Sequence, residues 1–142
     1  MTKEEILKYN KLCAEFIGAK PCEDWQGYDA YEHPDWCHNV WSNKYQDYID
    51  IDTYTVINLK FHEDWDWIMN VVGAIQKLNI DEYGLGEFVV NYSNRQGHYL
   101  EIRDRNCYDT KIEDGWGETI KEAYVNCINN FLNWYKEENK QK

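Results

Sequence analysis

The stretch from residue 62 to residue 78, HEDWDWIMNVVGAIQKL, constrains the fold more than any other part of the chain. Its apolar residues recur at every third or fourth position, among them Trp65, Ile68, Val72 and Ile75. This spacing is typical of one face of an α-helix. Asp64 is a good N-cap residue, and acidic groups in a first turn favour the positive end of the helix dipole. We therefore expect a helix over residues 63–78, around which the rest of the domain packs.

Two more helices are predicted near the ends of the chain. Thr2 followed by Glu5 forms a capping box, and the apolar spacing after it predicts a helix over residues 2–17 that ends at Gly18. A continuous apolar face predicts a closing helix over residues 117–137.

Strands are predicted where β-branched and aromatic residues cluster. Residues 53–61, TYTVINLKF, form one such run, and residues 87–93 and 98–105 form a hairpin around NRQG. Residues 107–112 add a short third strand, and Gly115 and Gly117 mark the following loop. The sequence thus predicts a single α+β domain over residues 1–142, with three helices packed on a small, largely antiparallel sheet.

The composition limits the partners of the chain. Its 142 residues carry 26 acidic and 15 basic side chains, for a net charge of -11. Such a surface repels phosphate, so we expect no direct binding to nucleic acid and instead attraction to a basic protein surface. No run of 18 apolar residues exists, which argues against a membrane span.

The cysteines and the N-terminus bear on the compartment. The five cysteines are odd in number and irregularly spaced, and the first ten residues lack the apolar core of a signal peptide. We therefore expect reduced thiols and a cytoplasmic protein, with Cys13 and Cys127 buried on apolar helix faces.

Residues 20–52 differ in kind from the rest of the chain. From residue 22 to residue 52 there are eight acidic side chains, one basic side chain and seven Trp or Tyr residues, without a clear period. Residues 42–49, SNKYQDYI, are a candidate short helix with Ser42 as its cap. A connection this long is uncommon unless it has a function. Two interpretations stay open: the aromatic residues anchor a protein partner, or they cover the core of their own domain.

Catalytic and metal-binding motifs are weak. His33, Cys37 and His38 lie close together with Cys22 upstream, but no paired Cys-x-x-Cys or spaced histidine pair accompanies them. A nucleophile and base could be formed by Cys37 or Cys107 with His62 or His98, but no flanking sequence supports such a pair. The sequence also has no Gly-rich phosphate loop. We therefore expect no enzyme activity, no catalytic residues, no metal and no cofactor.

Three arginines of the predicted hairpin, Arg95, Arg103 and Arg105, allow a different kind of site. Guanidinium groups hold phosphate or carboxylate ligands well. In a chain so rich in Asp and Glu, the alternative is that these arginines pair with the acidic side chains of the protein itself.

Three stretches of the chain resemble one group of proteins. LKFHEDWDWIMNVVGAIQKL, with its aromatic-His pair before Asp-Trp-x-Trp-aliphatic-Met and Val-Val, resembles a motif of small uncharacterised phage and prophage proteins of Bacteroidetes type. ETIKEAYVNCINNFLNWYKE and NKLCAEFIGAK resemble the closing and opening helices of the same proteins. Together the three stretches cover about half of the chain. The resemblance implies an accessory phage protein with an α/β fold, and it carries no catalytic motif.

These observations lead to a hypothesis about function. We expect a phage-type acidic inhibitor, similar in role to an anti-CRISPR protein, that binds the basic nucleic-acid-binding site of a host defence nuclease without catalysis. The expected partner-binding residues are the acidic and aromatic side chains of the unusual segment: Glu23, Asp24, Trp25, Asp29, Glu32, Asp35, Trp36, Trp41, Asp47 and Tyr48.

Two alternatives stay open. One is an immunity protein that neutralises a basic toxin. The other belongs to a different class: a small-ligand binder that sequesters a nucleotide signal, with Trp or Tyr rings stacking on the base.

Overall fold

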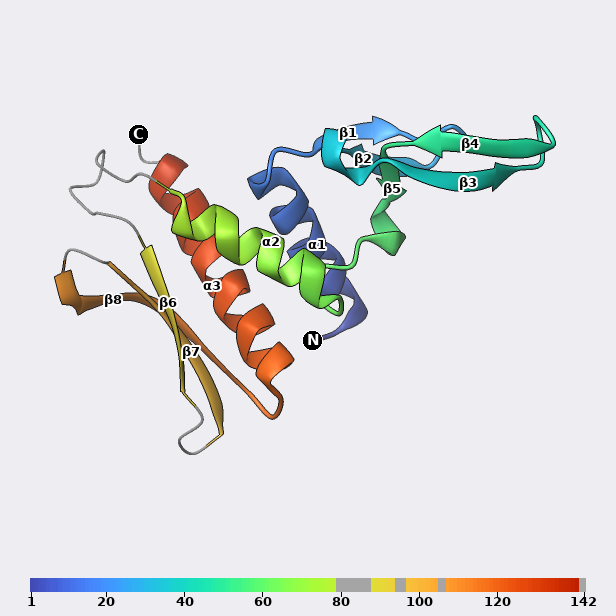
Figure 1. Ribbon diagram of the computed structural model, residues 1–142. Helices are drawn as coiled ribbons and strands as arrows, with labels where there is room; N and C mark the ends of the chain where they lie inside the picture. Colours follow the sequence, from blue (N-terminus) through green and yellow to red (C-terminus); the bar gives the residue numbers. More distant parts are fainter. Residues whose placement is uncertain (79–87, 94–96, 105–106, 141–142) are drawn as a thin grey trace. The chain divides into compact units, whose positions relative to one another are not determined.

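The computed structural model describes residues 1–78, 88–93, 97–104 and 107–140 of the chain (Figure 1). Its contacts divide the chain into two compact units, Met1–Leu59 and Lys60–Lys142. The described residues form three α-helices and small antiparallel sheets, which confirms the predicted α+β class. The prediction of a single domain over residues 1–142 stays a prediction.

The first unit begins with helix α1, Lys3–Phe16, in the predicted place. The Thr2 hydroxyl accepts a hydrogen bond from the Glu5 backbone N–H at 3.2 Å and so caps the first turn. The inward face of α1 buries Tyr9, Asn10, Leu12, Cys13 and Ala14. Asn10 donates from Nδ2 to the Leu59 carbonyl at 3.1 Å, which ties α1 to the end of the unit.

The interpretation of residues 20–52 as one long connection is wrong, because the segment is built from short strands. These are β1 (Lys20–Glu23), β2 (Asp29–Glu32), β3 (His38–Ser42) and β4 (Asp47–Ile51), with a 3-10 turn at Pro34–Trp36. Strands of four or five residues offer too few alternations to show a period in the sequence.

The candidate helix at residues 42–49 is therefore also wrong. Ser42 ends β3 and its hydroxyl accepts from the Tyr45 N–H at 3.3 Å, so it caps the hairpin turn instead of a helix. Gln46 adopts a positive φ of 54°, a conformation that a tight turn requires and a helix does not. β4 follows directly, and β3 and β4 pair along their whole length.

The predicted strand at residues 53–61 is only partly correct. β5 spans Thr53–Thr55 and is followed by a 3-10 turn, Val56–Asn58. β5 completes an antiparallel sheet in the order β1-β2-β5, and β3 and β4 form a separate two-stranded sheet. The strand is short because only residues 30–32 of β2 pair with it.

The second unit contains the predicted central helix as α2, Trp65–Gln76. The Asp64 carboxylate accepts from the Asp66 N–H at 2.9 Å, as the capping argument requires. The buried face comprises Ile68, Val71, Val72 and Ile75. The two tryptophans serve mainly as packing residues, since Trp67 meets Phe61 edge to face at 4.8 Å and Trp65 meets Tyr124 at 5.4 Å.

The predicted hairpin is confirmed as β6 (Phe88–Ser93) and β7 (His98–Asp104), and β8 (Cys107–Gly117) adds a third antiparallel strand. β8 is longer than expected, because it includes Gly115 and Gly117, which were assigned to a loop. Helix α3, Ile120–Lys140, packs on β7 and β8. A Cβ on Gly115 would lie 2.2 Å from the Cys127 backbone nitrogen, so this glycine permits the close approach of α3.

Candidate protein-binding surface

The β3–β4 hairpin carries an exposed pair of aromatic rings. Trp41 pairs directly with Tyr48 across the two strands, and their ring centroids lie 5.2 Å apart at an interplanar angle of 74°. Side chains alternate between the faces of a strand, so the neighbouring pair of Val40 and Ile49 points to the opposite face. Val40 and Ile49 are half-buried, whereas Trp41 is 48% and Tyr48 66% exposed. The hairpin thus presents its aromatic face to solvent.

The base of the hairpin is fixed to the sheet of the first unit by ring contacts. The ring of His38 on β3 stacks on the ring of Tyr54 on β5, with centroids 4.4 Å apart and planes 11° from parallel (Figure 1 labels β3 and β5). The Trp36 ring meets Tyr54 edge to face at 5.6 Å, and the His33 N–H donates to the Asp52 carbonyl at 3.1 Å. The strands beyond this anchor carry the exposed rings.

Trp36 is therefore a correction to the predicted partner-binding set. Its side chain is only 8% exposed, because it packs against His33 and Tyr54. It serves as a core residue of the first unit and does not offer a ring to a partner.

Most of the other predicted residues do reach the surface. Eight of the ten are exposed: Glu23, Trp25, Asp29, Glu32, Asp35, Trp41, Asp47 and Tyr48. Asp24 is half-buried, and its carboxylate accepts from the N–H groups of Gln26 and Tyr28 at 2.9 Å each. Asp24 therefore holds the turn between β1 and β2, and its charge is partly used within the protein.

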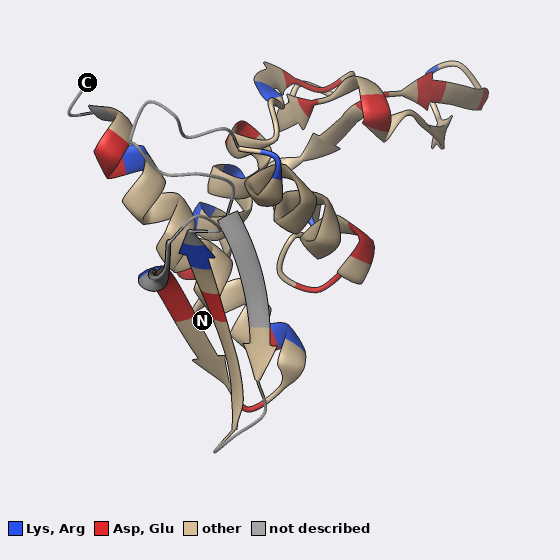
Figure 2. Cartoon of the chain, turned by 60° about the vertical axis from the view of Figure 1, so that its left-hand side comes forward, with Lys and Arg blue, Asp and Glu red and all other residues tan. Residues whose placement is uncertain are grey.

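Acidic residues far outnumber basic ones along this segment (Figure 2 colours Asp and Glu red). Between residues 22 and 52 the sole cation is Lys44, whose ammonium lies 5.3 Å from the Tyr45 ring centroid. Within the described part of the chain, neither Asp47 nor Asp50 has a cationic partner. The carboxylates of the hairpin are thus available to a basic surface.

Sequence reasoning missed several exposed side chains. Tyr28 and Tyr45 are each 61% exposed and Asp50 lies on the outer face of β4, yet none of them was singled out. Alternation along residues 47–51 could have found Asp50 once that stretch was recognised as a strand. Ile57 is 79% exposed, and its assignment to a strand interior concealed it.

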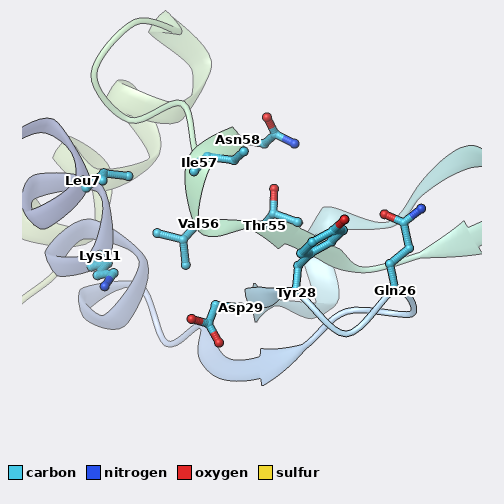
Figure 3. Close-up of a pocket in the computed structure, with 9 residues that line it drawn as sticks. All are labelled: Leu7, Lys11, Gln26, Tyr28, Asp29, Thr55, Val56, Ile57 and Asn58. Atoms are coloured by element: carbon cyan, nitrogen blue, oxygen red, sulfur yellow. The ribbon is translucent and has the colours of Figure 1, made fainter. Parts of the chain in front are cut away.

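The first unit also contains an open cleft of about 610 Å³ (Figure 3). Apolar side chains of Leu7, Val56 and Ile57 line it together with the Tyr28 ring. Its charged lining consists of Lys11 on α1 and Asp29 on β2. The size and the mixed lining suit a small organic ligand. One cation is a modest attraction for a phosphate group, and the nearby carboxylate opposes it.

Of the three arginines considered in the sequence, Arg103 lies on β7 in the second unit. Arg103 donates from Nη2 to Glu101 Oε2 at 3.2 Å, and this bond holds the pKa of Glu101 below its usual value. The Tyr99 hydroxyl lies 3.1 Å from both Glu101 and Asp114. Arg103 thus pairs with the protein's own acid, as the alternative interpretation required. Arg95 and Arg105 lie outside the described residues.

His33 and His38, the histidines of the possible metal motif, form hydrogen bonds within the protein. His33 accepts the Asp35 N–H on Nδ1 at 3.1 Å, which leaves Nε2 to donate to the Ile17 carbonyl at 3.2 Å. His38 donates from Nδ1 to the Trp36 carbonyl at 2.7 Å. In the ranges that the structure describes, no group of three or more His, Cys, Asp or Glu side chains is placed to hold a metal ion.

The buried thiols are confirmed. Cys13 and Cys127 are both fully buried, and burial raises the pKa of Cys127 to about 12. A thiol with so high a pKa is a poor nucleophile at neutral pH. Cys37 is exposed and Cys22 is half-buried.

Comparisons with other proteins add no further constraint. No protein-family model matches the chain, and no curated protein or solved structure matches it either. Among the residues that the structure describes, none of the helices combines the length and the apolar character needed to cross a membrane.

Proposed function

We propose that this protein is a non-catalytic inhibitor that occupies the basic nucleic-acid-binding site of a larger protein. One observation carries the proposal: the β3–β4 hairpin exposes Trp41 and Tyr48 beside carboxylates that have no cationic partner among the described residues. The resemblance to phage proteins favours a host defence nuclease, such as a CRISPR effector, as the partner.

The physical basis has two parts. A negative surface speeds the association with a positive one and favours partners of complementary charge. Aromatic side chains near the centre of an interface supply most of the affinity, because they bury large areas and have few rotamers to lose. The hairpin combines both features on one short element. Its two strands also hold the rings in place before binding, which lowers the entropy cost of association.

A pull-down tests this proposal. The tagged protein is incubated with lysate of a bacterial host at low salt, eluted in salt steps, and the eluates are analysed by mass spectrometry. We expect a basic nucleic-acid-processing protein to elute at modest salt. A basic toxin in its place would support the immunity alternative, and the absence of any basic partner would contradict both.

Charge neutralisation on this surface gives a sharper prediction. Replacing Asp29, Asp35 and Asp47 by Asn is expected to slow association with the captured partner about tenfold at low salt, because electrostatic steering is lost. The free energy of unfolding should stay nearly unchanged, since all three side chains are exposed. Association rates by surface plasmon resonance at two salt concentrations measure the effect.

A matched control variant carries the same change of charge elsewhere. Its substitutions fall on three exposed acids outside the segment: Glu4→Gln, Asp66→Asn and Glu118→Gln. An equal loss of association rate in this control would show that net charge alone matters and would contradict a role for the segment.

The cleft favours a second candidate, the small-ligand binder. In this hypothesis a nucleotide stacks its base on Tyr28 and places a phosphate near Lys11. A thermal-shift screen of nucleotides is the test, and a ligand at a hundred times its Kd would add about 2.7 kcal/mol to the free energy of unfolding. Lys11→Met should abolish that gain. No shift with any nucleotide would rule the candidate out.

A further inference from the structure

The outer face of the β3–β4 hairpin places a carboxylate beside the two exposed rings. Asn39 pairs with Asp50 and Trp41 pairs with Tyr48, and residues two apart on a strand point to the same side. One face therefore carries Asn39, Trp41, Tyr48 and Asp50, and all four side chains are exposed. Tyr48 and Asp50 are neighbours along β4 on this face, about 7 Å apart by strand geometry.

We propose that this face binds arginine side chains of the basic partner, with the guanidinium stacked on an aromatic ring and hydrogen-bonded to Asp50. The inference rests on the proposed function, because it names the chemical group by which the partner is recognised. The occupant is thus an arginine-rich protein surface.

The ring pair leaves aromatic faces that a cation can contact. In an edge-to-face pair at 74°, the ring that presents its edge keeps both of its own faces uncovered by the other ring. The Trp41 indole N–H already donates to Asn43 Oδ1 at 3.0 Å, so the polar edge of this ring is satisfied within the hairpin. The hairpin tip already contains a cation–π contact, because the Lys44 ammonium lies over the Tyr45 ring.

A carboxylate beside an aromatic ring favours the guanidinium of arginine over the ammonium of lysine. A guanidinium is planar, so it can stack on a ring while its N–H groups point sideways to a carboxylate. A lysine ammonium is a compact, strongly hydrated charge and gains less from stacking. A ring and a carboxylate side by side on one strand face therefore favour arginine. Arginine is also common where proteins hold phosphate groups, which agrees with a nucleic-acid-binding site as the target.

The test compares oligo-arginine and oligo-lysine peptides of equal length, titrated into the whole protein and followed by calorimetry. We expect the arginine peptide to bind about two- to fivefold more tightly than the lysine peptide, the fold-change of one exposed cation–π contact. Replacing Trp41 and Tyr48 together by Leu keeps apolar side chains but removes both rings, so this double variant should reduce the preference for arginine. Asp50→Asn should weaken the binding of the arginine peptide more than the binding of the lysine peptide.

Asp66→Asn on α2 is the matched control, because it makes the same change of charge at an exposed acid outside the hairpin. Its arginine preference should equal that of the wild type. Equal affinity for both peptides, an unchanged preference in the variant with Trp41 and Tyr48 replaced by Leu, or an equal effect of Asp66→Asn and Asp50→Asn would each overturn the proposal.

The outcomes also separate this proposal from the inhibitor function. A basic partner that is captured from lysate while the two peptides bind equally would leave the inhibitor function supported and arginine recognition refuted. Selective binding of the arginine peptide without any captured basic partner would refute the inhibitor function and support recognition of the guanidinium.

Discussion

Replacing Trp41 and Tyr48 together by Ala is expected to weaken binding of the captured partner by about a hundredfold or more. Aromatic residues at an interface centre each contribute about 2 kcal/mol or more when truncated. The fold should survive, because both rings are largely exposed and a cross-strand pair of this kind stabilises a sheet by at most about 1 kcal/mol. Calorimetric titration with the partner and thermal denaturation of the variant measure the two quantities.

Trp116→Ala is the matched control for this prediction. Trp116 is 51% exposed and also forms a cross-strand ring pair, with Tyr99 at 4.4 Å, but it lies in the second unit. It should leave partner binding unchanged. If the control weakens binding as much as the hairpin variant does, or if the hairpin variant binds normally, the β3–β4 face is not the interface.

Gly115→Val is expected to lower the free energy of unfolding by about 3 kcal/mol or more, or to prevent folding. A Cβ at residue 115 would lie 2.2 Å from the backbone nitrogen and 2.6 Å from the Cα of Cys127. Both atoms belong to the backbone of α3, so relief requires the helix to move away from β8. That shift would open the packing around Cys127, Ile128 and Phe131, all fully buried. Chemical denaturation gives the magnitude.

Gly73→Ala serves as the contrasting glycine substitution. Gly73 lies inside α2, and apart from its chain neighbours and the backbone of its own helix no described atom lies within 4 Å of the position that its Cβ would occupy. Alanine is better than glycine in a helix by about 1 kcal/mol, so this variant should be more stable than the wild type. A destabilised Gly73→Ala together with a tolerated Gly115→Val would contradict the packing described for the second unit.

The helices could be predicted because their evidence is local. Thr2 and Asp64 bond to backbone N–H groups within three residues, and the apolar spacing that follows each cap extends over three or more turns. The hairpin of β6 and β7 is local in the same sense, since its two pairing strands lie close together in the sequence.

The strands of residues 20–52 could not be predicted in the same way. β1, β2, β3 and β4 are four or five residues long, and the sequence of each shows at most two alternations. Their stability comes from pairing with one another and from contacts such as the stacking of His38 on Tyr54. Gly115 is similar: with Gly117 it indicates a loop in the sequence, whereas in the structure it permits helix α3 to pack against strand β8.

The candidate site was also predictable from the sequence only in part. Composition alone determined that the segment from residue 22 to residue 52 is acidic and aromatic, because charge and ring content do not depend on folding. Only the tertiary structure decided which rings are available: Trp36 is buried against Tyr54, whereas Trp41 and Tyr48 face solvent beside Asp50. The physical reason is that strand register sets the face to which each side chain points, and register depends on partners distant in the sequence.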